Sequence, residues 1–146
     1  IADFEIPACD ILIALHACDT ATDDAIFKGI RSGAEAIVVS PCCHKQIRKQ
    51  LHIENELKEI TRHGILEERM AEMATDSMRA LMLEAHGYET RVFEYISDEH
   101  THKNIMITAV KKKKTAEPSV YLEKIGGLKK FLGINKFYLE ELFDHS

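Results

Sequence analysis

Two short apolar runs with one helical segment between them constrain the fold of this chain most strongly. Residues Ile11–Leu15 are continuously apolar, and Ala34–Ser40 form a second short run that is rich in β-branched residues. Short continuous apolar runs are typical of strands that are buried on both faces. Between the runs, apolar residues recur at helical spacing. The sequence therefore predicts a βαβ unit with parallel strands and a right-handed crossover.

The predicted helix between the two runs carries a start signal and a stop signal. Thr20 and Asp23 have the spacing of an N-capping pair, and acidic residues suit the positive end of a helix. Gly33 suits the left-handed conformation that ends many helices. These signals place the helix directly between the two predicted strands.

The middle of the chain predicts helices. Leu51–Arg62 indicates a short helix, and Ile65–His86 carries the strongest helical pattern of the sequence. One stripe of the longer helix includes Leu66, Met70 and Met73. Methionine fills irregular gaps between packed elements, so we expect this stripe to face the core.

The later part of the chain predicts two strands and a helical tail. Tyr88–Ile96 alternates as a half-buried strand does, and Asn104–Val110 is a further strand, with the polar loop Ser97–Lys103 between them. We expect these two strands to be antiparallel neighbours. The aromatic segment Ser119–Leu142 predicts two helices, broken at Gly133–Asn135. Residues 1–114 are thus expected to form an α/β portion, and residues 115–146 a helical tail that packs on it.

Composition excludes several classes of protein. The chain has 146 residues, of which 45% are hydrophobic, and its 24 acidic residues exceed its 19 Lys and Arg residues. The apolar content is therefore not low, as it is in disordered chains, and we expect a folded protein. A net charge of −5 means that nucleic acid would have to bind at a local patch, such as the lysine run Lys111–Lys114. No apolar run approaches the roughly 20 residues that span a bilayer, so we expect no membrane association.

The four cysteines favour a reducing compartment. Cys9, Cys18, Cys42 and Cys43 show no spaced disulfide framework, and two of them are adjacent. We therefore predict reduced thiols and a cytoplasmic location.

Polar residues follow both predicted parallel strands, at the edge of the sheet where ligands of α/β proteins bind. The residues expected to share this edge are His16, Cys18, Asp19, Cys42, Cys43 and His44. Histidine and thiolate are zinc ligands, so one interpretation is a metal site, although the usual C-x₂₋₄-C spacing is absent. Another is a cysteine nucleophile, Cys42 or Cys43, beside a histidine. A third is that the thiols only pack beneath the edge.

Two motifs at this edge resemble one enzyme family. The segment LHACDTATDDAI spans Leu15–Ile26, and VVSPCCHKQI spans Val38–Ile47. Together they resemble class I S-adenosylmethionine-dependent methyltransferases of the methyltransferase-like type, which include relatives of the eukaryotic tRNA ribose 2′-O-methyltransferase. The closing segment KNIMITAVKK resembles the last strand of such domains. The resemblance covers roughly Asp10–Lys112 and implies a Rossmann-like sheet of parallel strands with a final antiparallel strand.

The resemblance also implies roles for individual residues. The loop after the first strand would face the methyl donor through Leu15, His16 and Ala17, and His16 or Asp19 would be the catalytic base. The acceptor pocket would be lined by Cys18, Pro41, Cys42, Cys43 and His44. No metal is implied. The acceptor would be a nitrogen or oxygen atom, and the tRNA relative together with the lysine run favours an RNA substrate.

Two departures from the family pattern shape the expectation. Asp19 stands where the family has glycine, and no G-x-G loop for the cofactor occurs among the seven glycines of the chain. The first three strands of the fold are also missing. The chain is therefore expected to be the carboxyl half of the fold and to pair through the edge of its first strand with a missing amino-terminal half or a second copy. The alternative is a non-catalytic partner-binding module on the same half sheet.

Overall fold

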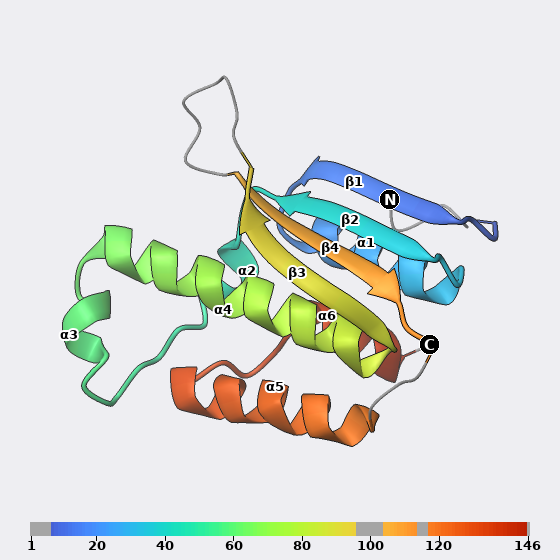
Figure 1. The fold of residues 1–146 in the computed structure, drawn as a ribbon. Helices are drawn as coiled ribbons and strands as arrows, with labels where there is room; N and C mark the ends of the chain where they lie inside the picture. The colour runs from blue at the N-terminus through green and yellow to red at the C-terminus, as the bar shows by residue number, and fades with distance from the viewer. Residues whose placement is uncertain (1–6, 96–103, 114–116, 146) are drawn as a thin grey trace.

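A computed structural model describes residues 7–95, 104–113 and 117–145 as one sheet with helices packed on it (Figure 1). The elements, in chain order, are β1 (Ile11–Ala17), α1 (Thr20–Arg31), β2 (Ala36–Pro41), α2 (Lys45–Arg48), α3 (Lys58–Thr61), α4 (Gly64–Ala85), β3 (Tyr88–Glu94), β4 (Ile105–Lys111), α5 (Pro118–Leu132) and α6 (Tyr138–Asp144).

The four strands form a mixed sheet in the order β1-β2-β4-β3. Strands β1 and β2 are parallel, with Ile11 opposite Ala36, and α1 joins them as predicted. Strand β4 lies between β2 and β3 and is antiparallel to both. The expected α/β fold, with parallel strands and a final antiparallel strand, is therefore confirmed, as is the antiparallel pairing of the last two strands.

The core lies between the sheet and the helices on one of its faces. Ile37, Val39 and Ile107 are fully buried on this face. Helix α1 approaches β2 closely, since a Cβ atom placed on Gly29 would lie 2.8 Å from Cδ1 of Ile37. The hydroxyl of Tyr88 donates to the carbonyl oxygen of Ala34 at 2.8 Å and ties the start of β3 to the start of β2.

The opposite face of β1 is open, which corrects the prediction of a strand buried on both faces. Leu12 is 8% exposed and lies beside α1, whereas Ile11, Ile13 and Leu15 are 57% to 63% exposed. These three side chains alternate with Leu12 and point to the face that the described helices leave uncovered. The prediction failed because an apolar run does not reveal what covers it.

The long helix agrees with the prediction in extent but not in orientation. Helix α4 spans Gly64–Ala85, yet Met73 is 59% exposed, while Met78 and Met82, which flank the predicted stripe, are buried. Only Lys58–Thr61 is helical within the predicted helix Leu51–Arg62. Either the predicted stripe or the neighbouring stripe with Met78 and Met82 is apolar enough to face the core. Tertiary packing decides which of the two is buried.

The signals proposed for the first helix have different outcomes. Gly33 has φ 73°, as the predicted C-terminal stop requires. Asp23 does not cap the helix, because its carboxylate is buried and accepts a hydrogen bond from Arg79 at 2.7 Å. No side-chain capping bond is present at the start of α1.

The tail forms the two predicted helices, and both pack on the rest of the chain (Figure 1). Helix α5 lies against α4, and α6 lies against α1. The hydroxyl of Tyr138 donates to Oδ1 of Asp24 at 3.0 Å, and the ring of Phe143 meets that of Phe27 edge-on at 4.8 Å. The tail thus reaches both helices that cover the sheet.

Some expectations fall on residues outside the described ranges. The loop Ser97–Lys103 lies there, and so does Lys114 at the end of the lysine run. In the part of the chain that the structure describes, no helix combines the length and the apolar character needed to cross a membrane.

Gly133 offers a direct test of how the tail is fixed. Gly133 ends α5 with φ 67°, and a Cβ atom there would collide with the carbonyl oxygen of His52. We predict that Gly133→Ala lowers the free energy of unfolding by at least about 1–2 kcal/mol, because a left-handed conformation is costly for alanine even without the collision. Urea denaturation measures the change.

Gly127 is the matched control for this substitution. It lies inside α5, and a Cβ atom placed on it would meet nothing within 4 Å. Gly127→Ala should raise the free energy of unfolding by about 0.5–1 kcal/mol through its higher helix propensity. Equal effects of the two substitutions would contradict the described end of α5.

Candidate functional site

The loops that follow β1 and β2 meet at the carboxyl edge of the parallel strands. The pairing of β1 with β2 shifts its register between Leu15 and Ala17. His16 has φ 56° and Asp19 has φ 51°, both in the region that favours glycine. Residues other than glycine persist in such conformations only where the surroundings fix them, and they cluster at functional sites. The end of β1 is therefore a strained turn.

Three of the four cysteines converge at this turn. The Sγ atoms of Cys18, Cys42 and Cys43 all lie within 4.8 Å of one another. Those of Cys42 and Cys43 are 3.9 Å apart, and Cys42 Sγ is also 3.8 Å from the carbonyl oxygen of His16. Cys9 is elsewhere, with its Sγ 3.3 Å from Oγ of Ser32. The structure thus brings together the thiols of both predicted loops.

Two thiols of this group, those of Cys18 and Cys42, have a raised pKa. Burial and, next to it, the neighbouring thiol of Cys43 raise the pKa of Cys42 to about 11. A hydrogen bond with Cys43 is the largest of the effects that raise the pKa of Cys18. Because the thiolate is the nucleophile, these shifts argue against the interpretation of Cys42 as a nucleophile.

A buried arginine connects the turn to the long helix. Arg79 of α4 is fully buried and donates from Nε to Oδ1 of Asp23 at 2.7 Å and from Nη1 to Oδ1 of Asp76 at 3.0 Å. Its Nη2 donates to the backbone carbonyl of Asp19 at 2.8 Å. Burial alone would lower the pKa of Arg79, but the two carboxylates raise it overall, so the guanidinium stays charged. Burial is also the main reason why the pKa of Asp23 is raised.

The same network reaches the loop after β2. Oδ1 of Asp76 accepts a second hydrogen bond, from Nε2 of His44 at 3.1 Å. Oδ1 of Asp19 accepts a hydrogen bond from the backbone N–H of Gln46 at 3.1 Å, at the start of α2. One connected set of polar groups therefore fixes both loops relative to α1 and α4.

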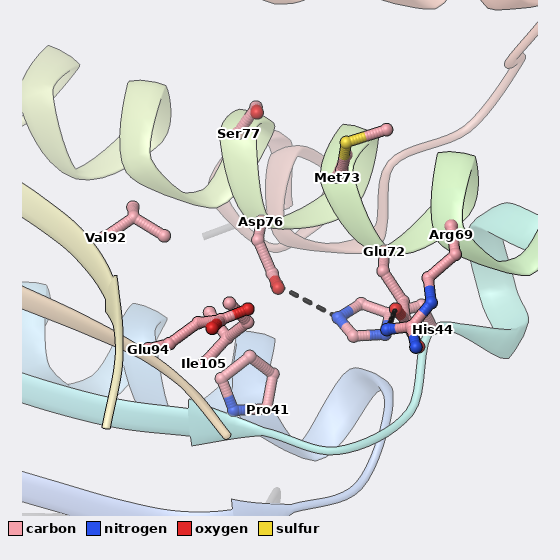
Figure 2. A pocket seen from close by; sticks show the side chains of 10 residues that line it. All are labelled: Pro41, His44, Arg69, Glu72, Met73, Asp76, Ser77, Val92, Glu94 and Ile105. Carbon is pink, nitrogen blue, oxygen red and sulfur yellow. Dashed lines mark hydrogen bonds and ion pairs between the residues drawn. The ribbon is translucent and has the colours of Figure 1, made fainter. Parts of the chain in front are cut away.

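A pocket of about 440 Å³ lies beside His44, between α4 and the ends of β2, β3 and β4 (Figure 2). Asp76 points from α4 toward His44, and Glu94 and Ile105 face them from the sheet. The polar side chains that line the pocket are His44, Arg69, Glu72, Asp76, Ser77 and Glu94. Its apolar lining is Pro41, Met73, Val92 and Ile105. The pocket mixes apolar walls with a few convergent polar groups, as small-molecule sites do.

The predicted site residues take different places at this edge. Pro41 and His44 line the pocket, and their role on the acceptor side stays a prediction. His16 is exposed at the turn, and Leu15 is exposed on the open face of the sheet. The carbonyl oxygen of Ala17 accepts a hydrogen bond from Oγ1 of Thr22 at 2.7 Å.

Sequence reasoning missed the buried charges. Asp76 and Arg79 are three residues apart within a helix, and the buried Met78 and Met82 flank Arg79. Charged residues on an apolar helix face are a signal for a buried ion pair, because such groups are almost never fully buried without a partner. The partner on α1 is Asp23, whose spacing from Thr20 indicates a capping residue instead.

Comparison with known proteins gives one result for this edge. Residues 4–50 match the family model of a methyltransferase domain, which supports a methyltransferase family for this chain. The matched residues include β1, α1 and β2, and also α2, which follows β2. No curated protein and no solved structure matched the chain.

Arg79→Leu tests whether the buried network supports the fold. We predict that it lowers the free energy of unfolding by about 3–5 kcal/mol, because it leaves the buried carboxylates of Asp23 and Asp76 without a compensating charge. Arg79→Lys should lie between the wild type and Arg79→Leu, since lysine keeps the charge but lacks the rigid fork of donors. Chemical denaturation measures all three proteins.

Arg69 on the same helix is the matched control. Its side chain is 48% exposed, and its ion pair with Glu72 spans 3.3 Å on the helix surface. Arg69→Ala should cost less than about 1 kcal/mol, as exposed pairs do. A similarly small loss for Arg79→Leu would mean that the network does not support the fold.

Proposed function

We propose that this chain is the carboxyl portion of an S-adenosylmethionine-dependent methyltransferase that transfers a methyl group to a nitrogen or oxygen acceptor. One observation carries the proposal. The stretch that matches a methyltransferase domain contains β1, α1 and β2. The turn after β1 is strained, and buried charges hold it and the loop after β2 in place. Ligands of α/β sheets bind at this edge of the strands.

The chemistry of the turn fits one side of the cofactor. Leu15 is 57% exposed and His16 is exposed, so the end of β1 offers both an apolar and a polar side chain to a ligand. The cofactor supplies a methyl group on a positively charged sulfur. The sequence contains no G-x-G loop for the remainder of that molecule. In our proposal Leu15, His16 and Ala17 therefore contact the methyl-bearing part, and a preceding segment or a second chain binds the rest.

His16 is the best candidate for the base that removes a proton from the acceptor. Asp19 is less suited, because its Oδ1 already accepts the N–H of Gln46. His44 is less suited as well, because its Nδ1 is fully buried and has no hydrogen-bond partner among the described residues. Asp19 and His44 then serve to hold the two loops in place, which is the alignment that methyl transfer requires.

The pocket lined by Pro41 and His44 is our candidate for the acceptor site, and the thiols of Cys18, Cys42 and Cys43 lie at the same edge. Among its lining residues, Arg69 pairs with Glu72, and Asp76 pairs with Arg79, which is fully buried and not part of the lining. Glu94 adds a further carboxylate. This balance favours a neutral or positively charged nitrogen acceptor over a phosphate group.

The lysine run gives RNA no support at this pocket. Nζ of Lys111 donates to the carbonyl oxygen of Gly33 at 3.2 Å, near the start of β2. The described part of the run, Lys111–Lys113, therefore lies at the opposite end of the strands from the loops after β1 and β2. RNA remains a candidate acceptor only through the resemblance to the tRNA enzyme.

The partner that completes the proposed enzyme would pair with β1. This strand is at the edge of the described sheet, and Ile11, Ile13 and Leu15 extend an exposed apolar surface beside that edge. Unpaired edges and exposed apolar faces favour association with another segment. We propose a missing amino-terminal half as the partner, and a second copy of the chain as the alternative.

The test is calorimetric titration of S-adenosylhomocysteine into the protein made from its complete reading frame, with residues 1–146 alone as the comparison. We expect the complete protein to bind with one site per chain, and residues 1–146 alone to bind weakly or not at all. The reason is that these residues contact only part of the ligand.

Two outcomes would change the account. If neither protein binds, the enzyme is excluded and the partner-binding module replaces it. Tight binding by residues 1–146 alone would mean that these residues hold the whole cofactor, and the proposed division between two segments would be wrong.

A further inference from the structure

We propose that Cys18, Cys42 and Cys43 form a three-thiolate site for a zinc-like divalent metal ion, with the fourth coordination position open. The proposal concerns the group of thiols where the loops after β1 and β2 meet. It does not rest on methyltransferase activity, because the three ligands and their geometry are the same whether or not the chain binds a methyl donor.

The spacing of the sulfur atoms fits such an ion. Zinc binds thiolates at about 2.3 Å, so two sulfur ligands of a tetrahedral site lie about 3.8 Å apart. The Sγ atoms of Cys42 and Cys43 are 3.9 Å apart, and those of all three cysteines lie within 4.8 Å of one another. A shift of less than about 1 Å in Cys18 would complete a trigonal face of thiolates.

The backbone holds the ligands in position without a metal ion. Cys18 lies between His16 and Asp19, the two residues with positive φ. The carbonyl oxygen of Asp19 accepts the Nη2–H of Arg79, and its carboxylate accepts the N–H of Gln46. Cys18 is thereby fixed against the loop that carries Cys42 and Cys43. A site that is already assembled loses little entropy when it binds an ion.

The fourth position faces outward. Cys18 is exposed and Cys42 and Cys43 are partly exposed, so solvent reaches the group from one side. In the described part of the chain, the group contains no histidine and no carboxylate. Three protein ligands with one open position are typical of zinc ions that bind a water molecule or a substrate. Thiolate ligands select zinc and other soft metals over magnesium or calcium.

The experiment uses the full chain, purified under reducing, oxygen-free conditions and stripped with a chelator. Cd²⁺ is titrated in, and the ultraviolet absorption of cadmium–thiolate bonds is recorded. Competition with Zn²⁺ then gives the affinity for zinc. We expect one ion per chain, with an absorption that corresponds to three thiolates. Binding should release protons, because a thiol binds a metal ion as the thiolate.

Single substitutions identify the ligands. Cys18→Ser, Cys42→Ser and Cys43→Ser should each weaken binding by more than the roughly 10–100-fold that loss of an outer-shell partner costs. Cys9→Ser is the matched control, since Cys9 pairs with Ser32 and lies outside the group. His16→Asn should also leave binding unchanged, because the proposed site uses no histidine.

Three results would overturn the proposal. One is a folded wild-type chain that shows no cadmium–thiolate absorption at micromolar metal. Another is full binding by Cys18→Ser, because the proposed site needs the thiolate of Cys18. The third is loss of binding in Cys9→Ser or His16→Asn.

Circular dichroism of each variant verifies folding. S-adenosylhomocysteine binding by the complete protein is measured separately, so failure of either proposal leaves the other open to its own test.

Discussion

The guanidinium of Arg79 is the interaction on which the rest of this structure depends. It is fully buried and joins Asp23 of α1, Asp76 of α4 and the backbone carbonyl of Asp19. Removing a charge from water costs several kcal/mol, and only well-placed opposite charges offset that cost. Because the partners lie on separate segments, the guanidinium is stable in this position only when α1, α4 and the turn after β1 are assembled together.

This constraint explains why the candidate functional residues lie together at the carboxyl ends of β1 and β2. Asp76 accepts a hydrogen bond from His44, and Asp19 accepts one from the backbone at the start of α2. These bonds fix the loops after β1 and β2 relative to each other. The strained turn and the three thiols belong to these two loops, and the pocket lies beside them. The open face of β1, by contrast, presents exposed apolar side chains. The methyltransferase match covers the same βαβ unit.

The sequence predicted the features that depend on local patterns. The strands β1 and β2, the helix between them and the stop at Gly33 follow from apolar spacing and from one backbone conformation. The open face of β1 was not predictable, because Ile11, Ile13 and Leu15 have the same side chains whether covered or exposed. The network around Arg79 was not predictable either, since Asp23 lies on another helix and only folding brings the two together. For the site, the meeting of the two loops was foreseen from topology, whereas the place of Asp76 beside His44 was not.

A crystal structure of the complete protein with S-adenosylhomocysteine tests the central claim most directly. The claim is that the loops fixed by Arg79 form the edge at which methyl transfer takes place. The account predicts that the sulfur of the ligand lies against Leu15–Ala17 and faces the pocket beside Pro41 and His44. A ligand bound elsewhere, with its sulfur remote from both loops, would contradict the account.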